Sequence, residues 1–188
     1  MSDTAAISQT THLSALRGRI GWICQTIRAL VIGFAIADFF AILDFWSDHG
    51  RVERHFQMVM KIDVSGASAA QYATAMASNM AVWVFVAVTC FCLWRVFSLY
   101  LRGSIFTAES ALWLRRAGIL GFVTVLVDVA TRSAIILALA AHLPAQQSHH
   151  GFVRLDDLLY VIFTLMVIAL AQIFKTAAEI AGEHAQFV

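Results

Sequence analysis

The chain has 188 residues, of which 60% are hydrophobic and only 13% carry a charge, and its formal net charge is +1. Soluble domains carry about 25% charged residues, so this composition excludes an ordinary soluble domain and indicates an integral membrane protein. Because the charge balance gives no bulk basic character, we expect no direct binding to nucleic acid.

Residues 1–19 form a polar N-terminal segment, and a largely apolar run extends from residue 20 to about residue 44. A cleaved signal peptide would place its basic flank directly after the start and a small-residue cleavage site after the apolar run. Here the first basic residue is Arg17, and the run ends in AILDFWSDHG. We therefore interpret the run as a first membrane span that is retained.

Three further segments are long and apolar enough to span a bilayer, at about 77–101, 117–143 and 155–176. Lipid offers no partner to unpaired backbone groups, so spanning segments of this kind must be helices. We therefore expect residues 20–188 to form one all-α domain, a four-helix bundle in the membrane. Before the second span, residues 56–64 alternate partly, as a short strand does, and the alanine-rich residues 67–80 favour an outward extension of the second helix.

Basic residues flank the two sides of this bundle unequally. One side holds Arg17, Arg19, Arg95, Arg102, Arg115, Arg116 and Lys175, and the other holds Arg51, Arg54, Lys61 and Arg154. Because the side richer in Lys and Arg stays in the cytoplasm, we expect both termini to be cytoplasmic. The loops at 45–76 and 144–154 then face outward.

An acid and a base interrupt the third span. Asp128 and Arg132 are four residues apart, so they share one face of the helix. Asp38 of the first span lies at a similar depth, and an arginine can serve two carboxylates. We expect Arg132 to bridge Asp128 and Asp38 inside the bundle. This network either fixes the helix register or forms a proton- or cation-responsive site.

The outward loops are rich in histidine. The candidates for metal ligands are His49, His55, His149 and His150, and acids accompany them at Asp48, Glu53, Asp63, Asp156 and Asp157. Imidazole with carboxylate suits zinc, and imidazole with the nearby thioethers of Met58 and Met60 suits copper. Because the spacing follows no metal motif, solvated loop histidines and a pH sensor are the alternatives.

Catalytic motifs are absent from the sequence: it contains no Gly-rich phosphate loop, no G-x-S-x-G and no H-E-x-x-H. We therefore expect a non-enzymatic protein with no catalytic residues and no cofactor. Cys24, Cys90 and Cys92 all fall in apolar segments, which is typical of small buried residues rather than of a disulfide framework. Gly118 and Gly121 permit a close helix contact, either within the chain or between copies.

The inner loop between the second and third spans has strong local signals. Gly103 is placed to end one helix in a left-handed cap, and Thr107 to begin the next with Glu109 in its first turn. The loop also carries a recognisable pattern, made of Phe97, Tyr100, Gly103, Ile105, Phe106 and Thr107, then Arg115 or Arg116, and Gly118. The ending IALAQIFKTAAEIAGEHAQFV adds Phe174, Glu179, Glu183 and Val188.

These residues resemble the pattern of a bacterial membrane family, the domain of unknown function 2975, from about residue 20 to the end of the chain. The resemblance implies a multi-pass protein of the bacterial inner membrane without an established activity. It also implies a regulatory partnership with a small helix-turn-helix transcription factor, which would dock on the cytoplasmic loop and tail. A small transporter, or a sensor of protons or metal, is the alternative. A homo-oligomer is compatible with either function.

Overall fold

The computed structural model is helical, and it describes the backbone of residues 2–60, 62–105, 107–139 and 153–186. Side chains are described for 21–59, 62–105, 107–139 and 153–180. The elements are α1 (Ser2–Ser47), α2 (His49–His55), a π-helical turn η1 (Phe56–Met60), α3 (Ala69–Leu101), α4 (Ala108–Leu139) and α5 (Leu155–Gln186). These ranges contain no strand, which confirms the predicted all-α class.

Four helical segments are long and apolar enough to cross a membrane: Gly21–Ser47, Ala69–Leu101, Ala108–Leu139 and Leu155–Ile180. In each of these segments, at most 17% of the most apolar 18-residue stretch is buried inside the protein. Hydrocarbon must therefore cover most of their apolar surface, since water would not. The chain is a multi-pass membrane protein.

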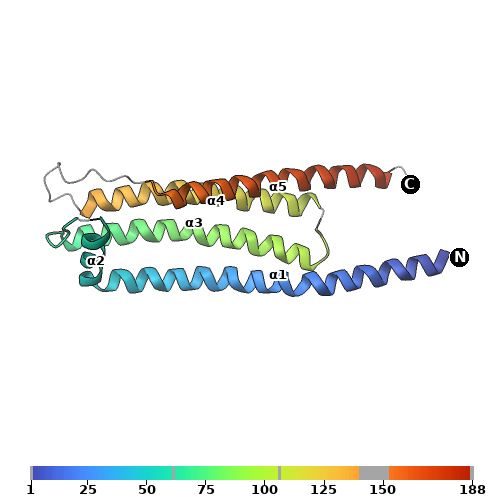
Figure 1. Cartoon of the computed structure of the whole chain (residues 1–188), viewed down its shortest axis with the longest axis horizontal. Helices are drawn as coiled ribbons and strands as arrows, with labels where there is room; N and C mark the ends of the chain where they lie inside the picture. The colour runs from blue at the N-terminus through green and yellow to red at the C-terminus, as the bar shows by residue number, and fades with distance from the viewer. Residues whose placement is uncertain (1, 61, 106, 140–152, 187–188) are drawn as a thin grey trace.

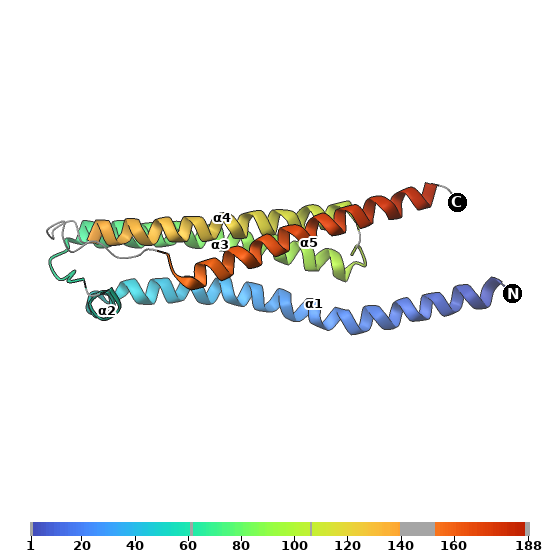
Figure 2. The same ribbon diagram turned by 45° about the horizontal axis from the view of Figure 1, so that its top comes forward.

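The helices pack in chain order, α1 on α3, α3 on α4, and α4 on α5. Within the described ranges, α1 makes no backbone approach to α4 or α5. Figures 1 and 2 show the start of α1 and the end of α5 at one end of the bundle, which we call the proximal end. The helix α2 and the turn η1 lie at the other, distal end (Figure 1).

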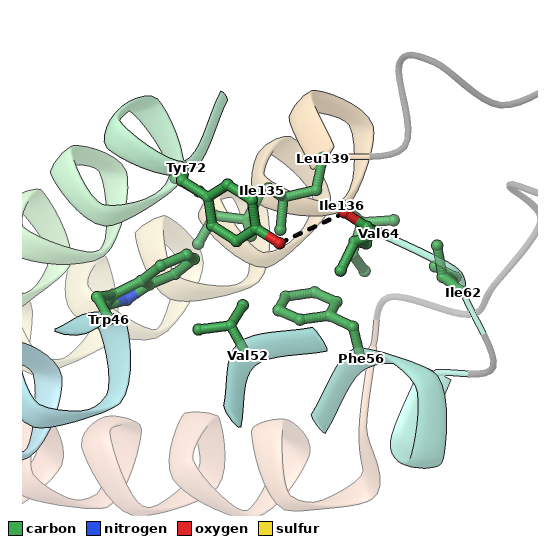
Figure 3. Packing of buried hydrophobic residues seen from close by; sticks show 10 residues of the cluster. Trp46, Val52, Phe56, Ile62, Val64, Tyr72, Ile135, Ile136 and Leu139 are labelled. Carbon is green, nitrogen blue, oxygen red and sulfur yellow. Dashed lines mark hydrogen bonds between the residues drawn. The ribbon is translucent and has the colours of Figure 1, made fainter. Parts of the chain in front are cut away.

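The distal end holds a hydrophobic core built from α1, α2, η1, the segment after η1, α3 and α4. Its buried residues are Trp46, Val52, Phe56, Ile62, Val64, Tyr72, Ala75, Ile135, Ile136 and Leu139 (Figure 3). The strand expected over 56–64 is wrong. A strand needs an edge to pair with, whereas this segment begins with a π-helical turn and buries Phe56, Ile62 and Val64 in the core.

The extension of the second span by a helix over the alanine-rich residues is confirmed, because α3 begins at Ala69. Ser68 and Gln71 form a reciprocal capping box: the Ser68 N–H donates to Gln71 Oε1 at 2.6 Å, and the Gln71 N–H donates to Ser68 Oγ at 3.4 Å. The Gln71 side chain also donates to the carbonyl of Ala138 at 2.8 Å. The start of α3 is thereby tied to the end of α4.

The turn between α3 and α4 follows the local signals of the sequence. Gly103 has φ 84°, and the N–H groups of Gly103 and Ser104 donate to the carbonyls of Tyr100 and Leu99, both at 3.0 Å. These bonds define a Schellman cap. The Ser110 N–H then donates to Thr107 Oγ1 at 3.2 Å, which caps α4 as predicted.

The two glycines of α4 face α5 in the same chain. A Cβ on Gly118 would lie 2.6 Å from Ile168 Cγ1 and 3.2 Å from the Ile168 backbone nitrogen. A Cβ on Gly121 would lie 3.1 Å from Thr164 Cγ2. The small residues therefore serve a contact within the chain, which decides between the alternatives that the sequence leaves open.

Candidate functional site

Arg132 of α4 joins two helices through one nitrogen. Its Nη2 lies 2.8 Å from Asp128 Oδ2, one turn earlier in α4, and 2.5 Å from Asp157 Oδ1, in the first turn of α5. The Arg132 side chain is 17% exposed, and those of Asp128 and Asp157 are 42% and 8% exposed. The most buried carboxylate is thus the one that crosses between helices, where charge-assisted hydrogen bonds offset its desolvation.

Asp157 also shapes the start of α5. The Arg154 N–H donates to Asp157 Oδ2 at 2.8 Å, and the Asp157 N–H donates to the Arg154 carbonyl at 3.1 Å. Asp157 is the third residue of α5, and its side chain accepts the N–H of Arg154, the residue that caps the helix. This arrangement is half of a capping box. One carboxylate therefore both caps α5 and binds it to α4. Asp157, which the sequence predicts only as an acid that accompanies the outward histidines, thus has a specific role in the first turn of α5.

Asp38 does not join this cluster as expected. The ion pairs of Arg132 in the described part of the chain are with Asp128 and Asp157. The reason is packing order, because α1 is separated from α4 by α3. The start of α5, in contrast, lies level with the Arg132 turn of α4. Asp38 still lies near enough to Asp128 for the two carboxylates to interact electrostatically, which makes it a third carboxylate in this region.

A cavity of about 350 Å³ adjoins the cluster at the distal end. Its charged lining residues are Asp128, Arg132, Arg154, Asp156 and Asp157, and its aromatic ones are Phe45, Trp46, Phe56 and Tyr160, with His55 beside them. The lining thus has one more aspartate than arginine. The cavity lies between the distal core and the first turns of α5, and it is of the size that small ligands occupy.

Two buried donors at this cavity lack partners. Trp46 is 6% exposed, and its Nε1 has no hydrogen-bond acceptor among the described residues. The Nε of Arg132 is likewise buried without an acceptor there. Buried donors normally have a partner, since leaving one unpaired costs about 1–3 kcal/mol. Both atoms are therefore suited to an acceptor supplied by a bound molecule.

The described residues give no further support to the hypothesis that the outward histidines bind a metal. His49 packs edge-on against Tyr72, with the ring centroids 4.6 Å apart, and His55 packs against Phe45 at 5.4 Å. No group of three or more potential metal ligands occurs among the described side chains. His149 and His150 lie outside the described residues, so a metal site that includes them stays a prediction.

The residues of the inner loop motif gather at the proximal end. Phe97 and Tyr100 pack edge-on with centroids 5.7 Å apart, Gly103 forms the turn and Thr107 caps α4. Phe106 lies outside the described residues. Arg116 lies over the ring of Trp113, 4.8 Å from its centroid, with Arg115 next to it and exposed. These contacts form a compact, basic turn.

The three cysteines are separate from both sites. Each is a free thiol in a span; Cys24 and Cys92 are buried and Cys90 is half-buried. The interpretation as small packed residues is compatible with these positions.

The family model described as "Protein of unknown function (DUF2975)" matches residues 63–188, which is more than half of the chain, and the chain belongs to this family. The match begins at residue 63 rather than at the expected residue 20, so the whole of α1, α2 and η1 lies outside it. Comparisons with curated proteins and with solved structures gave no significant match.

Several residues of the candidate site have no signal in the sequence that marks them as functional. Tyr160, Phe56 and Arg154 line the cavity, but they are ordinary interfacial or loop residues in the sequence. Asp157 carried one readable signal, because an acid in the first turn of a helix suits a cap. Its partnership with Arg132 had no signal, since it depends on how deep α5 begins.

Proposed function

We propose that the protein is a non-enzymatic regulator of the bacterial inner membrane that holds a small helix-turn-helix transcription factor at its cytoplasmic, proximal end. The observation that carries the proposal is the shape of this end. The start of α1 and the end of α5 project as helical arms beyond the turn between α3 and α4 (Figures 1 and 2). Arg102, Arg115 and Arg116 lie on that turn and at the start of α4.

The helix α5 offers a route between the two ends. It is one continuous helix of 32 residues, about 48 Å long at 1.5 Å per residue. Its first turn is bound to Arg132 beside the distal cavity, and its last turns form a proximal arm. A change at the cavity that moves the start of α5 would therefore displace the arm on which we expect the regulator to dock.

In-cell photocrosslinking tests this partnership. A photoreactive residue at Arg102 or Arg115 should capture a DNA-binding protein, whereas the same residue at the distal position Asp48 should not. Removal of residues 181–188 should abolish the capture while the shortened protein stays in the membrane. Capture of no cytoplasmic protein from either proximal position would reject the proposal.

The second candidate is a small transporter or a proton- or metal-responsive sensor. The ionic cluster beside an open cavity favours it, because ionisable groups within a span often mark pathways. The test is proton release by the purified protein on addition of a ligand or metal, compared with Asp38→Asn and Asp128→Asn. Identical release from all three proteins across a wide pH range would exclude a role for these carboxylates.

A further inference from the structure

The distal cavity combines three features: aromatic walls, an excess of carboxylates and unpartnered buried donors. We propose that it binds a small ammonium carboxylate, that is, an amino acid or an N-methylated amino acid such as a betaine. This inference concerns the ligand of the cavity and does not depend on the identity of any cytoplasmic partner.

The aspartates and aromatic rings that line the cavity suit the ammonium group of such a ligand. Asp128 is 42% exposed, and its one ion pair among the described residues is with an arginine that Asp157 also holds. Asp156 also lines the cavity, and no ion pair of its carboxylate occurs within the described residues. Trp46, Phe56 and Tyr160 surround the same space. Aromatic faces beside carboxylates attract alkylated ammonium groups through cation–π and ionic interactions.

The buried N–H donors without an acceptor suit the carboxylate group of the ligand. Trp46 Nε1 and Arg132 Nε are both buried and have no acceptor among the described residues. A cation alone would leave them unpaired, and an anion alone would face the excess of aspartates. A zwitterion satisfies both sets of groups, because its carboxylate accepts from the donors while its ammonium faces the acids.

The location gives such a ligand a structural consequence. Trp46 and Phe56 belong to the distal core, whereas Asp156 and Tyr160 belong to α5, which contributes no residue to that core. In Figure 3 the pale red ribbon of α5 runs below Val52 and Phe56 of the core. A molecule in the cavity therefore bridges α5 and the core, and it should stabilise the folded bundle.

The test uses the full chain in lipid nanodiscs and isothermal titration calorimetry with glycine betaine as the probe. We expect saturable binding of glycine betaine, at least tenfold weaker binding of choline, which lacks the carboxylate, and no binding of acetate, which lacks the ammonium. Equal affinity for choline and glycine betaine, preferential binding of acetate, or no binding of glycine betaine or glycine at millimolar concentration would each overturn the proposal.

Two variants assign the binding to this cavity. Asp128→Asn should weaken glycine betaine at least tenfold by removing a charge that faces the ammonium. Trp46→Phe keeps an aromatic ring but removes the orphan N–H, so it should weaken glycine betaine while leaving choline unchanged. Asp44→Asn is the control, because Asp44 pairs with Arg51 outside the cavity lining. If Asp128→Asn does not fold, Trp46→Phe decides alone, and unchanged affinity in the folded variant would refute the assignment.

Discussion

Asp157 Oδ1 lies 2.5 Å from Arg132 Nη2, and this contact connects the first turn of α5 to the distal part of α4. The two residues are 25 positions apart in the chain. The helix α5 otherwise rests on α4 through the close approach at Gly118 and Gly121. One polar contact near the distal end and one small-residue contact earlier in α4, nearer its middle, therefore hold the last helix in place.

Removal of the Asp157 carboxylate should destabilise the bundle strongly. Asp157→Ala leaves the largely buried Arg132 with one carboxylate and removes the acceptor for the Arg154 N–H. Loss of one partner of a buried ion pair costs about 3–5 kcal/mol, and we expect the lower end because Asp128 remains. The measurement is the free energy of unfolding in mixed detergent micelles.

The matched control for that experiment is Glu179→Gln, which breaks an exposed pair with Lys175 on the same helix. Exposed pairs of this kind contribute about 0–1 kcal/mol. Equal losses for Asp157→Ala and Glu179→Gln would show that the Arg132 contact does not hold α5.

Alanine at Gly118 should weaken the packing of α4 on α5. The new methyl group would lie 2.6 Å from the Ile168 side chain and 3.2 Å from its backbone nitrogen, so the helices must move apart. Overpacking of this type costs about 1–3 kcal/mol. Gly33→Ala is the control, since a Cβ there meets nothing within 4 Å. Unfolding in micelles should show a loss for Gly118→Ala and none for Gly33→Ala.

Gly103→Ala should destabilise the proximal turn, because φ at this position is 84° and a Cβ is strained there. The expected cost is about 1–2 kcal/mol. Gly103→Asn should cost less, since asparagine tolerates the left-handed region better than alanine. A reversed order of the two variants in the same unfolding assay would contradict the role of this glycine in the Schellman cap.

The two termini should be cytoplasmic, as the distribution of Lys and Arg predicts. Fusions of green fluorescent protein to either end should fluoresce, and alkaline phosphatase at the same positions should be inactive. Alkaline phosphatase inserted after Ser65, in the distal segment, should be active. Activity of phosphatase fusions at the ends would reverse the predicted orientation, although the ends would still lie on one side of the bundle (Figure 1).

Much of the proximal turn was readable from the sequence, because its determinants lie within a few residues of one another. Gly103 ends a helix wherever a positive φ is needed, and Thr107 caps the next helix through its own neighbour Ser110. The segment 56–64 misled for the opposite reason. Its partial alternation fits a strand, but the distal core it joins is assembled from elements that are distant in the chain.

Part of the ionic cluster around Arg132 could be predicted from the sequence. The spacing of Asp128 and Arg132 fixed their shared helix face, and the structure places them 2.8 Å apart. The third member was predicted by comparing depths across helices, and this comparison considered Asp38 of the first span and no residue of α5. Because α5 begins level with Arg132, Asp157 is the acid that reaches it rather than Asp38.

By itself, the sequence determined that this chain is a helical, four-span membrane protein, because hydropathy and helix capping depend on residues close together in the chain. Only the tertiary structure decided which carboxylate Arg132 holds, that Gly118 faces α5, and that a cavity adjoins the distal core. Those features depend on the packing order and relative depth of whole helices, and lipid-exposed surfaces of uniform hydropathy do not encode either.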